Sequence, residues 1–129
     1  MLLVEDETPL RKLLHQVLRS AGHTVLEAAN GDEAFAIGIR HSGQIDLLLT
    51  DVVMPGMKGH ELVDKLRARR PEITVLYMSG YDNELVDKKH LGNGSSFLAK
   101  PFSPKMLLKR IHTLLGYGGT EGEKASFAD

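Results

Sequence analysis

The feature that most constrains the fold is a regular alternation between short apolar runs and longer segments with helical spacing. The apolar runs lie at residues 2–4, 24–28, 46–50, 73–78 and 96–99. Three of them are almost continuously apolar, which is typical of strands covered on both faces. The segments with helical spacing lie at residues 9–21, 31–42, 59–70, 82–91 and 103–116. This alternation predicts an α/β fold, a doubly wound parallel sheet whose strands are joined by right-handed crossovers.

Length and composition narrow the class of protein further. A chain of 129 residues suits one domain with one core. A net charge of -1 provides no basic field for nucleic acid or for a membrane surface. No segment approaches the run of about 18 apolar residues that a membrane span needs, and no signal-peptide pattern is present. The absence of cysteine excludes disulfides and thiol chemistry. We therefore expect a cytoplasmic domain with no direct nucleic acid binding and no membrane segment.

The two ends of the chain suggest a folded part and a tail. Residues 117–129, "YGGTEGEKASFAD", are rich in glycine and charge, which predicts a flexible tail or a linker stub. The folded domain is then residues 1–116, and its first strand begins almost at Met1. These ends fit either a stand-alone domain or a domain excised from a longer protein.

Polar side chains lie at the ends of four of the five predicted strands. The first strand ends in Glu5, Asp6 and Glu7, the third in Asp51, the fourth in Ser79 and the fifth in Lys100. In an open parallel sheet, ligands bind beyond the carboxyl ends of the strands, where the strand order reverses. With the order 2-1-3-4-5, the first and third strands are neighbours and the crevice opens between them. We expect these side chains to meet in one site.

The residue types in this site favour phosphoryl transfer. Neighbouring carboxylates of Glu5, Asp6 and Asp51 repel one another unless a pKa rises or a cation binds. An all-oxygen set suits a hard ion, with Mg²⁺ the first choice. Lys100 and Ser79 offer donors to phosphate oxygens, and such positioning and charge neutralisation provide most of the catalysis in phosphoryl transfer. Asp51 would be the nucleophile and would form an aspartyl-phosphate.

Four stretches of the chain together resemble the receiver domains of bacterial two-component response regulators. They are "LLVEDE", "DLLLTDVVMPGMKGHEL", "VLYMSGY" and "FLAKPF", in this order along residues 1 to about 116. The resemblance implies a flavodoxin-like (βα)5 sheet with strand order 2-1-3-4-5. It also implies a signalling domain, not an enzyme, that accepts a phosphoryl group in a phosphorelay. The segments "LYMSGY" and "FLAKPFSP" are similar in sequence to receivers at the C-terminus of hybrid histidine kinases.

The resemblance also implies a role for each site residue. Asp51 looks like the phosphoacceptor and Lys100 like the partner of the phosphoryl group. Asp6 and Asp51 look like direct Mg²⁺ ligands, together with the backbone carbonyl of Val53. Glu5 would act on the metal through water.

Two further residues look like parts of a switch. Ser79 would hydrogen-bond the phosphoryl group and shift when it arrives, and Phe97 looks like the switch aromatic. The Lys100–Pro101 peptide is typically cis in this family. The family often has Asp, Thr and Tyr where this chain has Glu5, Ser79 and Phe97. Since Phe97 lacks a hydroxyl, we expect any switching to work by packing alone.

Partners follow from the same resemblance, and other functions stay open. The expected donor is a sensor histidine kinase or its phosphotransfer domain. The expected output partner would contact the face formed by residues 82–116, through which a homodimer is also possible. One alternative is a degenerate receiver that binds a partner without phosphorylation. Another is a small Mg²⁺-dependent aspartyl phosphohydrolase, although Val53 stands where such enzymes usually have a second acidic residue. Separately, the alternative for Ser79, which precedes Gly80, is a simple turn residue.

Overall fold

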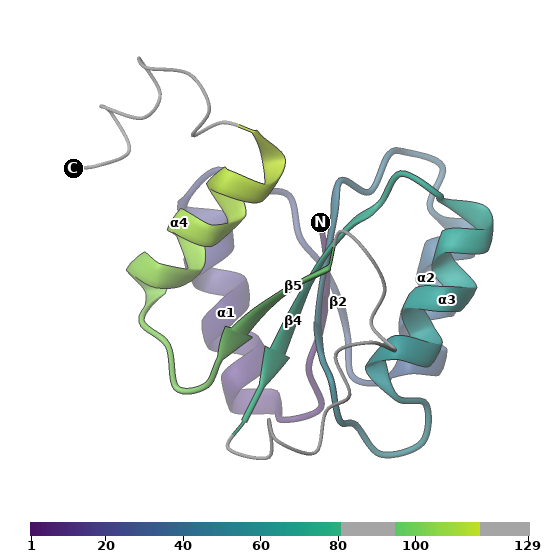
Figure 1. Ribbon diagram of the computed structural model, residues 1–129, viewed down its shortest axis with the longest axis horizontal. Coiled ribbons are helices and arrows are strands. Elements are labelled where there is room, and N and C mark those ends of the chain that lie inside the picture. The colour runs from purple at the N-terminus through teal and green to yellow at the C-terminus, as the bar shows by residue number, and fades with distance from the viewer. Residues whose placement is uncertain (81–94, 117–129) are drawn as a thin grey trace.

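A five-stranded parallel sheet forms the centre of the molecule (Figure 1). The computed structural model describes residues 1–80 and 95–116, and the strand order is β2-β1-β3-β4-β5, as predicted. The strands are β1 (Leu2–Val4), β2 (Leu26–Ala28), β3 (Leu47–Asp51), β4 (Thr74–Ser79) and β5 (Ser95–Ala99). The helices are α1 (Thr8–Ser20), α2 (Gly31–Arg40), α3 (Gly59–Arg69) and α4 (Pro104–Leu115). The predicted helix at 82–91 and the tail at 117–129 lie outside the described residues.

Helices cover both faces of the sheet and create two hydrophobic cores. α1 and α4 lie on one face, and α2 and α3 lie on the other (Figure 1). The three consecutive leucines of β3 are divided between these cores, because successive side chains of a strand point to opposite faces. Leu48 belongs to the core under α2 and α3, while Leu47 and Leu49 belong to the core under α1 and α4. This division explains why the strand has no polar alternation. Within the described ranges, no helix is long and apolar enough to cross a membrane.

The end of β3 agrees with the prediction and concerns the site. The third strand was expected to end in Asp51, and it does, because Asp51 pairs with Met78 of β4. The backbone amide of Val52 also donates to the carbonyl of Met78, at 3.0 Å. Asp51 is therefore held by sheet pairing on a strand and does not belong to the following loop. The second strand is shorter than expected and begins at Leu26.

The connection after β3 depends on a glycine. Gly59, the first residue of α3, lies against the end of β3, and a Cβ added there would be 2.3 Å from the carbonyl oxygen of Asp51. Its amide donates to the carbonyl of Val52, at 2.9 Å. Only a residue without a side chain allows this approach. The contact fixes where the loop that carries Val53 returns to the sheet.

Candidate functional site

Carboxylates gather beyond the carboxyl ends of β1 and β3. Glu5 and Asp6 follow β1, Asp51 ends β3, and one carboxylate oxygen of each lies within 4.8 Å of the others. Glu5 is fully buried and Asp51 is 5% exposed, whereas Asp6 is exposed. The backbone pairing of β1 with β3 places these side chains together, since the two strands are neighbours in the sheet.

Lys100 contacts two of these carboxylates. Its Nζ lies 2.6 Å from Oδ1 of Asp51 and 2.9 Å from Oε1 of Glu5. The other oxygen of Glu5 accepts a hydrogen bond from the amide of Glu7, at 3.0 Å. The Lys100–Pro101 peptide is cis, as the sequence resemblance implied. One cation thus faces two buried carboxylates, so ionisation of both would leave a negative charge uncompensated.

The pKa values of the two buried carboxylates, Asp51 and Glu5, are shifted in opposite directions. Burial is the largest cause that raises the pKa of Asp51, to about 7, and nearby Glu5 adds to it while Lys100 opposes it. Burial would also raise the pKa of Glu5, but hydrogen bonds with Asp51, the Glu7 amide and Lys100 outweigh it and lower that pKa. The pKa of Lys100 is raised, because its contacts with both carboxylates outweigh the effect of its burial. Near neutral pH, Asp51 is therefore balanced between its neutral and charged forms, and a bound cation would favour the charged form.

The remaining predicted site residues are Ser79, Val53 and Phe97. Ser79 ends β4, is buried, and borders the same cavity as Asp51; its carbonyl accepts a hydrogen bond from the amide of Lys100, at 2.7 Å. The side chain of Val53 is 63% exposed and also borders the cavity. Phe97 is not among the cavity residues. Its ring packs on Tyr77, with 5.6 Å between ring centroids, and its carbonyl accepts from Arg110.

The cavity beside Asp51 has a volume of about 520 Å³, and its apolar walls were not predicted from the sequence. Its polar residues include Asp6, Asp51, Ser79 and Lys100, and its apolar walls come from α1 and from the segment between β5 and α4. The apolar residues of these walls include Leu10, Leu13, Leu14, Val17, Phe102 and Pro104. Among them, Leu13 is 52% exposed.

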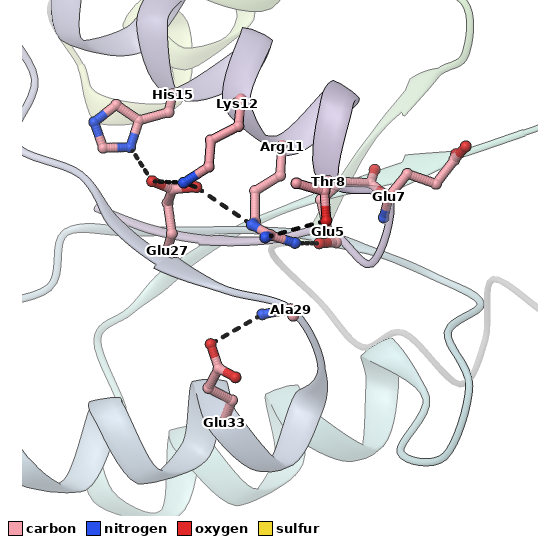
Figure 2. Close-up of polar contacts among 9 residues, drawn as sticks. All are labelled: Glu5, Glu7, Thr8, Arg11, Lys12, His15, Glu27, Ala29 and Glu33. Atoms are coloured by element: carbon pink, nitrogen blue, oxygen red, sulfur yellow. Dashed lines mark hydrogen bonds and ion pairs between the residues drawn. The ribbon is translucent and has the colours of Figure 1, made fainter.

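A second polar cluster joins α1 to β2, and Figure 2 shows it. Nε of Arg11 lies 3.3 Å from the Glu27 carboxylate, Nζ of Lys12 lies 3.4 Å from it, and Nδ1 of His15 lies 2.7 Å from it. Nη1 of Arg11 also donates to the backbone carbonyl of Glu5, at 2.8 Å. Arg11 therefore connects Glu27 with the residue that begins the acidic site.

This cluster leads to a prediction for stability. Burial would raise the pKa of Glu27, but the hydrogen bonds and charges of Lys12 and His15 outweigh burial and lower it. We expect Glu27→Gln to lower the free energy of unfolding by about 1 to 2 kcal/mol at neutral pH. Because the pKa is lowered in the folded state, this stabilisation is present above the unfolded pKa and is lost as pH falls through the folded pKa.

Urea unfolding at neutral pH and in acid, below the usual pKa of a glutamate, measures this difference. The control is Glu72→Gln, which changes an exposed glutamate that follows α3. Equal stability of the two variants at neutral pH would show that the cluster contributes nothing.

Comparisons with known proteins agree with the geometry. The family model described as the response regulator receiver domain matches residues 1–112. The chain is 39% identical over 116 residues to the sensor kinase CckA of Brucella abortus, covering 89% of this chain and 12% of that kinase. It is 32% identical over 127 residues to a chemotaxis protein CheY homolog of Campylobacter jejuni, covering 95% and 96% of the two chains.

Solved structures show the same similarity. The crystal structure of the receiver domain from the hybrid histidine kinase CckA matches with a TM-score of 0.76 and 38% identity, over 88% of this chain and 96% of that one. Four of the curated relatives are much longer than the match, since the chain spans only 12% to 47% of their lengths.

Proposed function

Because this chain belongs to the response regulator receiver domain family of two-component systems, we propose that its Asp51 accepts a phosphoryl group from a phosphohistidine. The donor would be a sensor histidine kinase or its phosphotransfer domain, in the cytoplasm. The observation that carries the proposal is the contact of 2.6 Å between Asp51 and Lys100, beside Glu5 and at the edge of an accessible cavity. A receiver that only binds a partner would not need this contact, and Lys100 would be free to point elsewhere.

The proposed transfer uses the groups already described. A carboxylate oxygen of Asp51 bonds to phosphorus, and the bond between phosphorus and the histidine nitrogen breaks. The electron pair stays on the imidazole, which takes a proton from solvent. Lys100 would turn its ammonium group toward one phosphoryl oxygen, and the hydroxyl of Ser79 would donate to another. Fixed donors of this kind stabilise the charge that the transition state develops.

The acidic cluster fits Mg²⁺. Three carboxylate oxygens lie within 4.8 Å of one another, and no imidazole or thiol is among them. Asp6 and Asp51 would hold the ion directly with the carbonyl of Val53, and Glu5 would act through water. When bound, Mg²⁺ neutralises negative charge on phosphoryl oxygens.

We predict that Mg²⁺ raises the melting temperature, because only the folded chain assembles the three carboxylates. At a concentration 100 times the dissociation constant, one site stabilises the folded state by about 2.7 kcal/mol. Thermal unfolding with Mg²⁺ and with chelator measures the effect. Asp6→Asn changes an exposed ligand and should reduce the shift without unfolding the chain. An absence of any shift at saturating Mg²⁺ would contradict the site.

Phosphoramidate tests the proposed activity, since its phosphorus–nitrogen bond matches that of phosphohistidine. We expect intact-mass spectrometry to show one phosphoryl group per chain in the presence of Mg²⁺ and almost none with chelator. The same sample should show no turnover of small phosphomonoesters, which a phosphohydrolase would hydrolyse. No uptake of phosphate under conditions where Mg²⁺ binds would contradict the phosphoacceptor role.

The proposed output is a shift between two existing conformations, which phosphorylation would bias. Ser79 would move toward the phosphoryl group, and Phe97 would respond by changing its packing on Tyr77. The output partner, or a second copy of the chain, would contact the face formed by residues 82–116, of which 95–116 are described.

A further inference from the structure

The cavity beside Asp51 has more apolar wall than a phosphoryl group and a metal ion require. Those two groups need only its polar end, formed by Asp51, Lys100 and Ser79 with Asp6 and Glu7. The rest of the cavity is bordered by residues of α1 and of the segment after β5, and we call this part the groove. Its volume of about 520 Å³ lies within the range of roughly 300 to 1,000 Å³ that is usual for small-molecule sites.

The groove joins apolar walls to Lys100, the cation that the proposed acceptor site uses to hold a phosphoryl group. Its apolar residues come from two directions, α1 and the segment after β5, so a bound chain would have walls on both sides. The apolar wall residues are Leu10, Leu13, Leu14, Val17, Phe102 and Pro104. Of these, Leu13 exposes half of its surface although it lies in a helix whose buried face is well supplied with leucine. Burial of such surface is favourable by about 25 cal/mol per Å².

We propose that this groove binds the hydrocarbon chain of acyl phosphates, so that the domain takes phosphoryl groups from longer acyl phosphates faster than from acetyl phosphate. The inference rests on the proposed role of Asp51 and names a class of small-molecule donor for it. The phosphate end would face Lys100, whose positive charge complements it, and the hydrocarbon would lie against Leu10 and Leu13. The groove is continuous with the acceptor site, because one set of cavity residues includes both.

The chemical step balances without a further reactant. A carboxylate oxygen of Asp51 bonds to phosphorus, and the bond between phosphorus and the oxygen that bridges to the acyl group breaks. The acyl carboxylate leaves with the electron pair. No oxidation occurs, and no proton needs to move when Asp51 is ionised.

The expected effect follows from the number of methylene groups that enter the groove. Each fully buried methylene contributes about 0.8 kcal/mol, which corresponds to roughly a fourfold change in affinity. Hexanoyl phosphate has four more methylenes than acetyl phosphate, and an open groove buries only part of them. We therefore expect about a tenfold higher second-order rate constant for hexanoyl phosphate.

The experiment compares the two donors on the same chain with excess Mg²⁺ and donor below saturation. Intact-mass spectrometry gives the initial rate of phosphoryl uptake from each, and the readout is the ratio of the two rates. Leu13→Gln removes exposed apolar surface while keeping a good helix former, and it should bring the ratio close to one. Ile39→Gln makes the same kind of change on α2, on the opposite face of the sheet, where Ile39 is 45% exposed. That control should keep the parent ratio.

The outcomes distinguish this inference from the proposed function. Uptake from both donors at equal rates, or a preference that Leu13→Gln leaves unchanged, overturns the groove as a chain-binding site and leaves Asp51 as the acceptor. No uptake from either donor overturns the phosphoacceptor role as well.

Discussion

Replacing Asp51 with asparagine is expected to raise the free energy of unfolding by about 2 to 4 kcal/mol at pH 8 without metal. Burial and the neighbouring Glu5 raise the pKa of Asp51 to about 7, so at this pH the folded state must hold a second buried anion. Asparagine has nearly the same shape, carries no charge and keeps an oxygen that accepts from Lys100. The structure therefore predicts that function, and not stability, requires the aspartate.

The pH dependence of this difference follows from the direction of the shift. The pKa of Asp51 is raised from 3.8 in the unfolded chain to about 7 in the folded one. Its contribution to stability is complete below the unfolded pKa and is lost as pH rises through the folded pKa. The gap in stability between the parent and Asp51→Asn should therefore be clearly smaller at about pH 5 than at about pH 8, where it has nearly its full size.

Urea unfolding in the presence of chelator, at both pH values, measures the gap. Asp64→Asn, which changes an exposed aspartate of α3, is the control and should show no comparable gap. If Asp51→Asn were unfolded, or less stable than the parent at pH 8, Asp51 would be a structural residue and the buried repulsion would be absent.

Replacing Lys100 with methionine is expected to have the largest destabilising effect. The change removes the cation that lies 2.6 Å from Asp51 and 2.9 Å from Glu5, and it leaves both carboxylates buried. Breaking a buried ion pair on one side typically costs about 3 kcal/mol or more. We also expect phosphoryl uptake to slow by roughly 100-fold, since one donor to the developing charge is lost.

A double-mutant cycle separates this charge effect from a loss of packing. In the Asp51→Asn background, Lys100→Met should cost clearly less, because only Glu5 remains as a buried anion. Lys109→Met, an exposed lysine of α4, is the matched control. If Lys100→Met destabilised the chain no more than Lys109→Met, the contacts of Lys100 would contribute nothing to the free energy of unfolding. The same cost of Lys100→Met in the parent and in Asp51→Asn would show that its contact with Asp51 contributes nothing.

The resemblance to receiver domains predicted the strand order, and the apolar runs were sufficient for the residues at the strand ends. Continuous apolar runs such as that of β3 identify strands buried on both faces. Because each run is short, its last residues show which polar residue stands at the end of the strand. The end of β3 at Asp51 was predicted in this way, and the pairing of Asp51 with Met78 explains how the strand includes a polar residue.

Other parts of the site depend on tertiary packing. Arg11 and Glu27 are separated by 16 residues and belong to no periodic pattern, so only the fold brings them together. Leu13 and Leu14 are adjacent in α1, equally apolar and both border the groove, yet Leu14 is buried while Leu13 is 52% exposed. The apolar stripe of α1 is wider than the surface that packs on the sheet, so a residue at its edge, such as Leu13, stays exposed. Helical spacing alone does not distinguish an edge residue from a buried one.

The most direct test of Asp51 as the phosphoacceptor is intact-mass spectrometry after incubation with acetyl phosphate and Mg²⁺, with the parent chain and Asp51→Asn treated side by side. Unfolding experiments on the same preparations establish that both chains are folded. The predicted result is one phosphoryl group on the parent and none on the variant. Equal phosphorylation of both chains, or none on a parent that binds Mg²⁺, would contradict the role proposed for Asp51.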